Sequence, residues 1–171
     1  RNLAIGNTSG EIIILLTQDA IPLGNTWLSN LIAGFESDPQ IIGVFGRHKA
    51  HKNHPKIIHR NIDNHFLIMG QTPIRKIDDI DEYNRNEILR QKLHFFSNNN
   101  SAIRRSEWEK IPFPDVAYGE DQTWAKLVLE KGYKIQYCPD AIVNHSHSFS
   151  TRKMYQRKKT EVSYFHRYFG Y

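Results

Sequence analysis

Two apolar runs rich in β-branched residues constrain the fold most, residues 11–17 (EIIILLT) and residues 41–46 (IIGVFG). Neither run alternates apolar and polar positions, which is typical of a strand buried on both faces, as in a parallel sheet. Between them, Trp27, Leu31 and Phe35 recur at helical spacing, which indicates an amphipathic helix. The order strand, helix, strand predicts an α/β layered fold.

The composition is typical of one globular domain. The chain has 171 residues, of which 39% are hydrophobic, so it is long enough and apolar enough to bury a core. No run of about eighteen apolar residues occurs, which excludes a membrane-spanning helix of that kind. The single cysteine, Cys138, excludes an internal disulfide and is expected to be buried. Because Arg1 opens the sequence inside a helical pattern, we expect the chain to be part of a longer protein.

The net charge of +5 is concentrated in residues 47–60 and residues 151–171. Such patches favour anionic partners, namely phosphates, nucleic acid or a lipid surface. Residues 47–60 are rich in histidine, but they contain Pro55 and little periodicity, so we predict a solvated loop rather than a metal site. Residues 151–171 predict a basic, aromatic helix, which could equally pack on the body of a larger protein. Nucleic acid is disfavoured as a partner because no recognition motif accompanies the charge.

Gly119, Glu120 and Asp121 place two adjacent carboxylates at the start of a predicted helix, residues 120–131, which Gly132 ends. Free backbone N–H groups and the helix dipole favour ionised carboxylates in this first turn. An ionised carboxylate in a fixed position can accept a proton or hold a cation. The alternative is plain helix capping, since acidic residues are common in first turns.

Further polar residues follow predicted strands. Asp19 comes just after the first apolar run, where open α/β sheets place their ligands, although it could simply form a turn. Residues 95–103 predict a strand that enters a cleft and presents side-chain amides, or else an Asn-rich turn. Residues 133–138 and 141–143 predict two short strands separated by a turn. His145 and His147 then follow, either as metal ligands or as structural residues. A capping box at residues 106–109 predicts a short helix that begins there.

Five stretches in this order resemble the inverting family 2 glycosyltransferases with a GT-A fold, and most of all bacterial rhamnosyltransferase-type enzymes. They are residues 1–6 (RNLAIG), 16–20 (LTQDA), 96–102 (FSNNNSA), 119–121 (GED) and 145–147 (HSH). The resemblance covers nearly the whole chain except residues 47–83 and the extreme tail. It implies a Rossmann-like GT-A fold with a mixed sheet flanked by helices. Residues 1–150 would be its larger C-terminal part, without the nucleotide-binding strands, and residues 151–171 a C-terminal helix.

The resemblance also implies a chemistry. A sugar would move from a nucleotide-diphospho-sugar to an acceptor hydroxyl with inversion, assisted by Mg²⁺ or Mn²⁺, in bacterial cell-surface polysaccharide synthesis. Asp121 matches the general base of the family, with Glu120 beside it. Asp19 matches the last residue of the Asp-x-Asp metal motif, but Thr17 stands at the first position, which leaves one carboxylate and puts metal binding in doubt. His145 or His147 would supply a further ligand.

The remaining expectations concern the substrate-binding residues, the acceptor and the location of the protein in the cell. Gln18, Asn98, Asn99, Trp108 and Gly119 are the expected substrate-binding residues, because amides bond to hydroxyls and aromatic faces stack on sugars. The acceptor would be a carbohydrate or lipid-linked saccharide. The protein would be cytoplasmic, at the inner face of the plasma membrane. The chain alone is expected neither to transfer sugar nor to bind nucleotide tightly. Two alternatives remain: a non-catalytic, carbohydrate-binding GT-A-like module, and a basic protein that binds a membrane surface.

Overall fold

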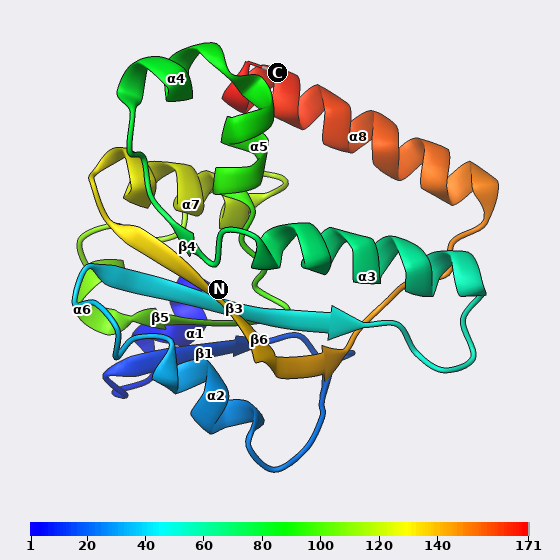
Figure 1. Cartoon of the computed structure of the whole chain (residues 1–171), viewed down its shortest axis with the longest axis horizontal. Coiled ribbons are helices and arrows are strands. Elements are labelled where there is room, and N and C mark those ends of the chain that lie inside the picture. Colours follow the sequence, from blue (N-terminus) through cyan, green and yellow to red (C-terminus); the bar gives the residue numbers. More distant parts are fainter. Residues whose placement is uncertain (171) are drawn as a thin grey trace.

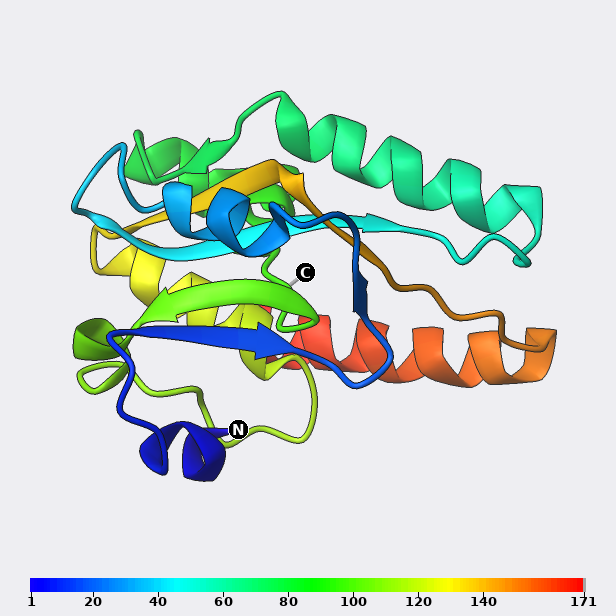
Figure 2. The same ribbon diagram turned by 90° about the horizontal axis from the view of Figure 1, so that it is seen from below.

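The computed structural model describes residues 1–170 as a mixed sheet with helices on both faces (Figures 1 and 2). Its strands are β1 (Ile12–Leu16), β2 (Ile21–Pro22), β3 (Ile41–Lys49), β4 (Ile74–Arg75), β5 (Asn100–Arg104) and β6 (Lys134–Asn144). Its helices are α1 (Asn2–Gly6), α2 (Trp27–Ala33), α3 (Lys56–Gly70), α4 (Ile80–Arg85), α5 (Glu87–His94), α6 (Arg105–Trp108), α7 (Glu120–Glu130) and α8 (Thr151–Phe169).

The strand order is β1-β5-β3-β6-β2, and β4 pairs with β6 outside this path. The pair β3 and β6 is parallel, whereas the other pairs are antiparallel. The predicted α/β fold with a mixed sheet flanked by helices is therefore confirmed. None of the helices in the described part of the chain is both long and apolar enough to cross a membrane.

The two faces of the sheet carry separate hydrophobic clusters. On one face, Leu31 of α2 packs with Val44 and Cys138, both of which are buried. On the other face, α3, α5, α7 and α8 lie together (Figure 1), and the larger cluster is centred on wholly buried Phe45 and Trp124. The predicted burial of Cys138 is confirmed. Burying aromatic rings of this size is the main source of stability for such a layered structure.

The prediction for the first apolar run was wrong in one respect. The run forms β1, but β1 pairs antiparallel with β5 and ends the sheet order, so it is neither central nor part of a parallel pair. Its side chains do alternate: Ile13 and Leu15 are buried in the larger cluster, whereas Ile12 and Ile14 are half-buried against the smaller one. Both faces carry apolar cover, which explains the unbroken apolar pattern. That pattern contains no information about strand direction.

Residues 47–60 are not the predicted solvated loop. Arg47, His48 and Lys49 continue β3, and His48 is buried with only 8% of its surface exposed. A short loop follows, and α3 begins at Lys56 directly after Pro55. Proline is favoured at a helix start because its missing N–H group would have no partner there. The predicted loop therefore consists of a strand end, a short connection and the first turn of a helix.

Three smaller predictions were also wrong. Residues 134–144 form one strand rather than two, because Pro139 and Asp140 occupy an exposed irregularity at which the pairing with β3 shifts register. A bulge accommodates a proline inside a strand without a turn.

The capping box is absent, because α6 starts at Arg105 and Ser106 lies within it. The strand predicted within residues 95–103 begins only at Asn100 and runs away from the preceding polar loop.

The two helices that matter most for the site were predicted closely. The helix expected at residues 120–131 is α7, and Gly132 after it has the left-handed φ of 84°. The basic, aromatic tail is α8; residue 171, part of that prediction, lies outside the described residues. Tyr164 and Phe169 bury one side of α8 against the body. The Tyr164 hydroxyl donates to the carbonyl oxygen of Gly119 at 2.8 Å, so α8 is attached at the start of α7.

Candidate functional site

The start of α7 holds the two predicted carboxylates at a fixed place. Trp124, one turn further along, is wholly buried, and its indole N–H donates to the carbonyl oxygen of Ile111 at 2.8 Å. Gly119 has a φ of 65°, and a Cβ atom there would lie 2.6 Å from the Tyr164 ring. Only glycine fits this left-handed, crowded position. Packing below the helix and at its cap therefore determines where Glu120 and Asp121 lie.

Asn98 holds both carboxylates from the loop before β5. Its backbone N–H donates to Oδ2 of Asp121 at 3.3 Å, and its side-chain amide donates to Oε1 of Glu120 at 3.3 Å. Asn98 is wholly buried, with 0% exposed surface. A contact between Asn98 and a substrate stays a prediction, and in this structure the side chain is enclosed. The observed role of Asn98 is to hold the two carboxylates in position.

The two carboxyls have pKa values shifted in opposite directions. Burial, followed by the charge of Glu120, raises the pKa of Asp121 to about 6 from 3.8, although N–H groups of Asn98 and Gln122 oppose the shift. Burial also acts on Glu120, but the ion pair with Arg1, at 2.7 Å, holds the pKa of Glu120 below its ordinary value. A carboxyl with a pKa near neutrality is suited to general base catalysis. The structure thus distinguishes Asp121 from its neighbour.

A second cluster joins the loop after β1 to the segment after β6. Oδ2 of Asp19 lies 3.5 Å from Nε2 of His145 and 3.6 Å from Nε2 of His147. One ligand atom from each residue lies within 4.8 Å of the others. Metal–ligand bonds of about 2.0–2.2 Å place neighbouring ligands about 3–4 Å apart, so these three residues fit one divalent cation. Thr17 contributes no carboxylate to this cluster, and its hydroxyl is buried.

The first cluster lines a cavity of about 450 Å³, whereas Asp19, His145 and His147 are not among its wall residues. Glu120, Asp121 and Gly119 line it, as does Asn99, which remains a candidate for substrate contact. His48 also lines it, and the centre of its ring lies 5.2 Å from that of His145. His48 therefore connects the cavity wall to the Asp19–His145–His147 cluster.

Two predicted substrate-binding residues do not reach this cavity wall. The indole N–H of Trp108 donates to Asn2 at 3.0 Å, and the ring packs on the larger hydrophobic cluster. Trp108 follows β5, whereas the cavity adjoins the loop before β5, so Trp108 lies away from this cavity and its contact with a substrate stays a prediction. Gln18 is exposed in the loop after β1 and is not among the residues that line the cavity.

Sequence reasoning missed the contribution of α8. Arg157 and Glu161 line the same cavity, together with His65 of α3 and Tyr118. The spacing of Arg157, Glu161 and Tyr164 places them on one face of a helix. That spacing could have indicated that one side of the basic tail faces the body, although it could not have identified the surface that it covers.

Replacement of Asp121 tests the raised pKa directly. The folded protein binds a proton at Asp121 more tightly than the unfolded chain, so ionising this carboxyl costs stability as the pH rises from about 4 to about 6. We expect Asp121→Asn to be more stable than the wild type at pH 7 by about 1–3 kcal/mol, and equally stable at pH 4. Denaturant unfolding across this pH range measures the difference.

Asp140→Asn is the matched control, because it removes the same charge at an exposed position. A stability gain for Asp121→Asn that did not depend on pH, or that Asp140→Asn reproduced, would contradict the assignment of the raised pKa to Asp121.

Comparison with known proteins identifies the relatives of the chain. No protein-family model matches it. The O-antigen chain rhamnosyltransferase RfbN of Salmonella typhimurium is 36% identical over 161 residues, and the O-antigen chain rhamnosyltransferase WbaN of Salmonella anatum is 33% identical over 161 residues. Each alignment covers 92% of this chain and 48% of the relative. The chain therefore spans about half the length of the curated relatives that it matches.

A solved structure has a fold similar to that of this chain. The mannosyltransferase PcManGT of Pyrobaculum calidifontis, in complex with GDP-Man and Mn²⁺, superposes with a TM-score of 0.56 at 19% identity. The superposition covers 91% of this chain and 37% of the mannosyltransferase. Over the aligned residues, the chain is thus similar in sequence to these two O-antigen chain rhamnosyltransferases, and its fold is similar to the GT-A-type fold of PcManGT.

Proposed function

We propose that this chain forms the cation-binding and acceptor-activating part of an inverting glycosyltransferase. The reaction is transfer of a sugar, with rhamnose as the first candidate, from a nucleotide-diphospho-sugar to a saccharide hydroxyl in O-antigen synthesis. The observation that carries the proposal is the single cavity lined by Asp121 and adjoined, through His48, by the Asp19–His145–His147 cluster. The names of the two Salmonella relatives and the GDP-Man in PcManGT support the sugar class and the donor class.

Asp121 acts as the general base. Its carboxylate takes the proton of the acceptor hydroxyl while that oxygen forms a bond to the anomeric carbon. The bond from the anomeric carbon to the diphosphate oxygen breaks on the opposite face, and its electron pair leaves with the nucleoside diphosphate. A pKa of about 6 keeps Asp121 ionised at neutral pH and still basic enough to take a proton. Asn98 fixes its orientation.

The cluster beside His48 is the part that would offset the negative charge of the leaving group. Asp19, His145 and His147 would hold a divalent cation, which neutralises charge on phosphate oxygens as a Lewis acid. Two imidazoles in the ligand set favour Mn²⁺ over Mg²⁺, since Mg²⁺ prefers oxygen ligands. Arg157 of α8 lines the cavity and adds a fixed positive charge suited to a phosphate oxygen.

The test is sugar transfer by the whole protein, with a nucleoside-diphosphate rhamnose as the donor. We expect kcat/KM to rise with pH along a single ionisation near pH 6 and then level off. Asp121→Asn should lower kcat by at least about 100-fold, because it removes the base. Glu120→Gln should retain transfer and move the ionisation to lower pH, because it removes a neighbouring negative charge.

Transfer by Asp121→Asn at the wild-type rate would contradict the role of Asp121. Saccharide binding by the wild type without any transfer would instead identify a non-catalytic carbohydrate-binding module.

The proposal includes a peripheral contact between α8 and an anionic membrane surface. The first turns of α8 expose Arg152, Lys153, Met154 and Tyr155, a combination of cationic and apolar side chains. Vesicles of phosphatidylglycerol and phosphatidylethanolamine should co-sediment the protein, and salt should weaken the binding. Reversing both charges, Arg152→Glu with Lys153→Glu, should weaken it at least about tenfold.

The control reverses two exposed charges outside α8, Lys92→Glu with Lys131→Glu. Equal weakening by both double variants would contradict a contact made by α8.

A further inference from the structure

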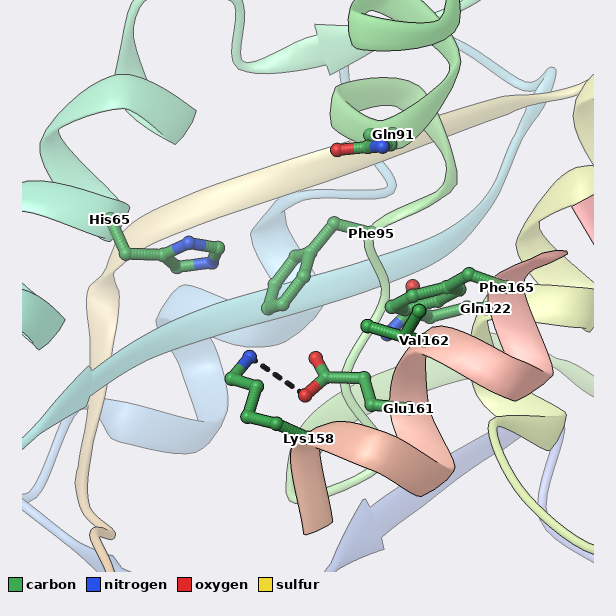
Figure 3. A pocket seen from close by; sticks show the side chains of 8 residues that line it. All are labelled: His65, Gln91, Phe95, Gln122, Lys158, Glu161, Val162 and Phe165. Atoms are coloured by element: carbon green, nitrogen blue, oxygen red, sulfur yellow. Dashed lines mark hydrogen bonds and ion pairs between the residues drawn. The ribbon is translucent and has the colours of Figure 1, made fainter. Parts of the chain in front are cut away.

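A second cavity, of about 460 Å³, opens between α3, α5 and α8 (Figure 3). It shares wall residues with the cavity that holds Asp121, namely His65, Phe95, Gln122 and Glu161. The two cavities therefore adjoin one another beside α8. A volume of this size lies within the roughly 300–1,000 Å³ of small-molecule sites.

The wall of the second cavity has the chemistry of a site for a neutral, hydroxyl-rich ligand. Gln91 and Gln122 face it, and within residues 1–170 neither side-chain amide makes a hydrogen bond to protein. Each amide offers both donors and acceptors, as sugar hydroxyls require. Phe95 and Phe165 supply aromatic rings in the same view (Figure 3).

The positive charge of Lys158 and the negative charge of Glu161 offset one another in this wall. Nζ of Lys158 lies 2.7 Å from Oε2 of Glu161, and Figure 3 shows the pair at the mouth formed by α8. A paired lysine and glutamate can still bond to hydroxyl groups but give no net attraction for an anion. An uncharged saccharide therefore fits this cavity better than a phosphate group does.

The position of Gln122 connects the second cavity to the reaction. It follows Asp121 in the chain and lies in the wall of both cavities. An acceptor whose attacking hydroxyl reaches Asp121 can therefore place a further sugar unit past Gln122 in the second cavity.

We propose that the second cavity binds the sugar unit next to the one that carries the attacking hydroxyl, and that Gln91 and Lys158 determine the specificity for it. The preferred acceptor is then at least a disaccharide. This inference rests on the proposed function and extends it from the reacting hydroxyl to the length of the acceptor.

The test compares acceptors of increasing length, namely synthetic mono-, di- and trisaccharides that share the same terminal sugar. Gln91→Ala and Lys158→Ala are the variants, since both residues lie on the surface of helices, where truncation leaves the core intact. Gln156→Ala and Lys159→Ala on α8 are the matched controls, because both are exposed and neither lines the cavity. Kinetics use the whole protein with the same donor.

Each variant should raise KM for the di- and trisaccharide about three- to tenfold, as expected for one lost hydrogen bond, with kcat and the monosaccharide KM unchanged. The controls should match the wild type. Equal effects on all acceptor lengths, or no effect on any, would overturn the assignment while leaving the proposed transferase intact.

A binding measurement keeps this inference separate from the transferase proposal. In NMR titrations of this chain, the side-chain amide signals of Gln91 and Gln122 should shift with the trisaccharide and not with the monosaccharide, while that of Gln156 stays fixed. Absence of these shifts overturns the second cavity as a saccharide site. Shifts in a protein that transfers no sugar would support saccharide binding in this cavity and contradict the proposed function alone.

Discussion

Two adjacent carboxylates at the half-buried start of α7 repel one another, and much of the surrounding structure offsets that repulsion. Arg1 neutralises Glu120, and Asn98 donates to both carboxylates. The free N–H groups of the first turn favour negative charge as well. Trp124 and Tyr164 fix the position of this turn from below and from α8. Because these contacts act unequally, Glu120 stays ionised and the pKa of Asp121 rises. Burial, followed by this repulsion, thus gives Asp121 a pKa near neutrality, as the proposed general base requires.

The sheet brings the other parts of the site to the same edge. Leu16 at the end of β1 pairs with Asn100 at the start of β5, so Asp19 and the loop before β5 lie at one end of this pair. Asn144 at the end of β6 pairs with Lys49 at the end of β3, which places His145 and His147 beside the buried His48. Antiparallel and parallel pairing therefore combine to bring the Asp19–His145–His147 cluster beside His48, which lines the cavity. This arrangement depends on topology, which no single motif contains.

Local patterns predicted much of this structure. Helical spacing located α7 closely, because the periodicity of a helix is recorded in consecutive residues. The basic, aromatic tail was predicted as the helix α8 from its composition. Asp19, His145 and His147 were proposed as one ligand set from a family resemblance, and the structure brings their ligand atoms together. The direction of β1 was wrong because an apolar run is compatible with either pairing. Asn98 was assigned to the substrate because the sequence does not show which amide is enclosed. The contribution of Arg157 depends on how α8 docks, which is a tertiary property.

The most direct measurement is the anomalous diffraction of Mn²⁺ in crystals of the whole protein grown with MnCl₂ and a nucleoside diphosphate. We expect one manganese peak bonded to the Asp19 carboxylate and to imidazole nitrogens of His145 and His147, with the diphosphate in the cavity lined by Arg157 and Asp121. A peak away from these residues, or none at saturating Mn²⁺ and nucleotide, would contradict the proposal that the cation site and the base serve one cavity.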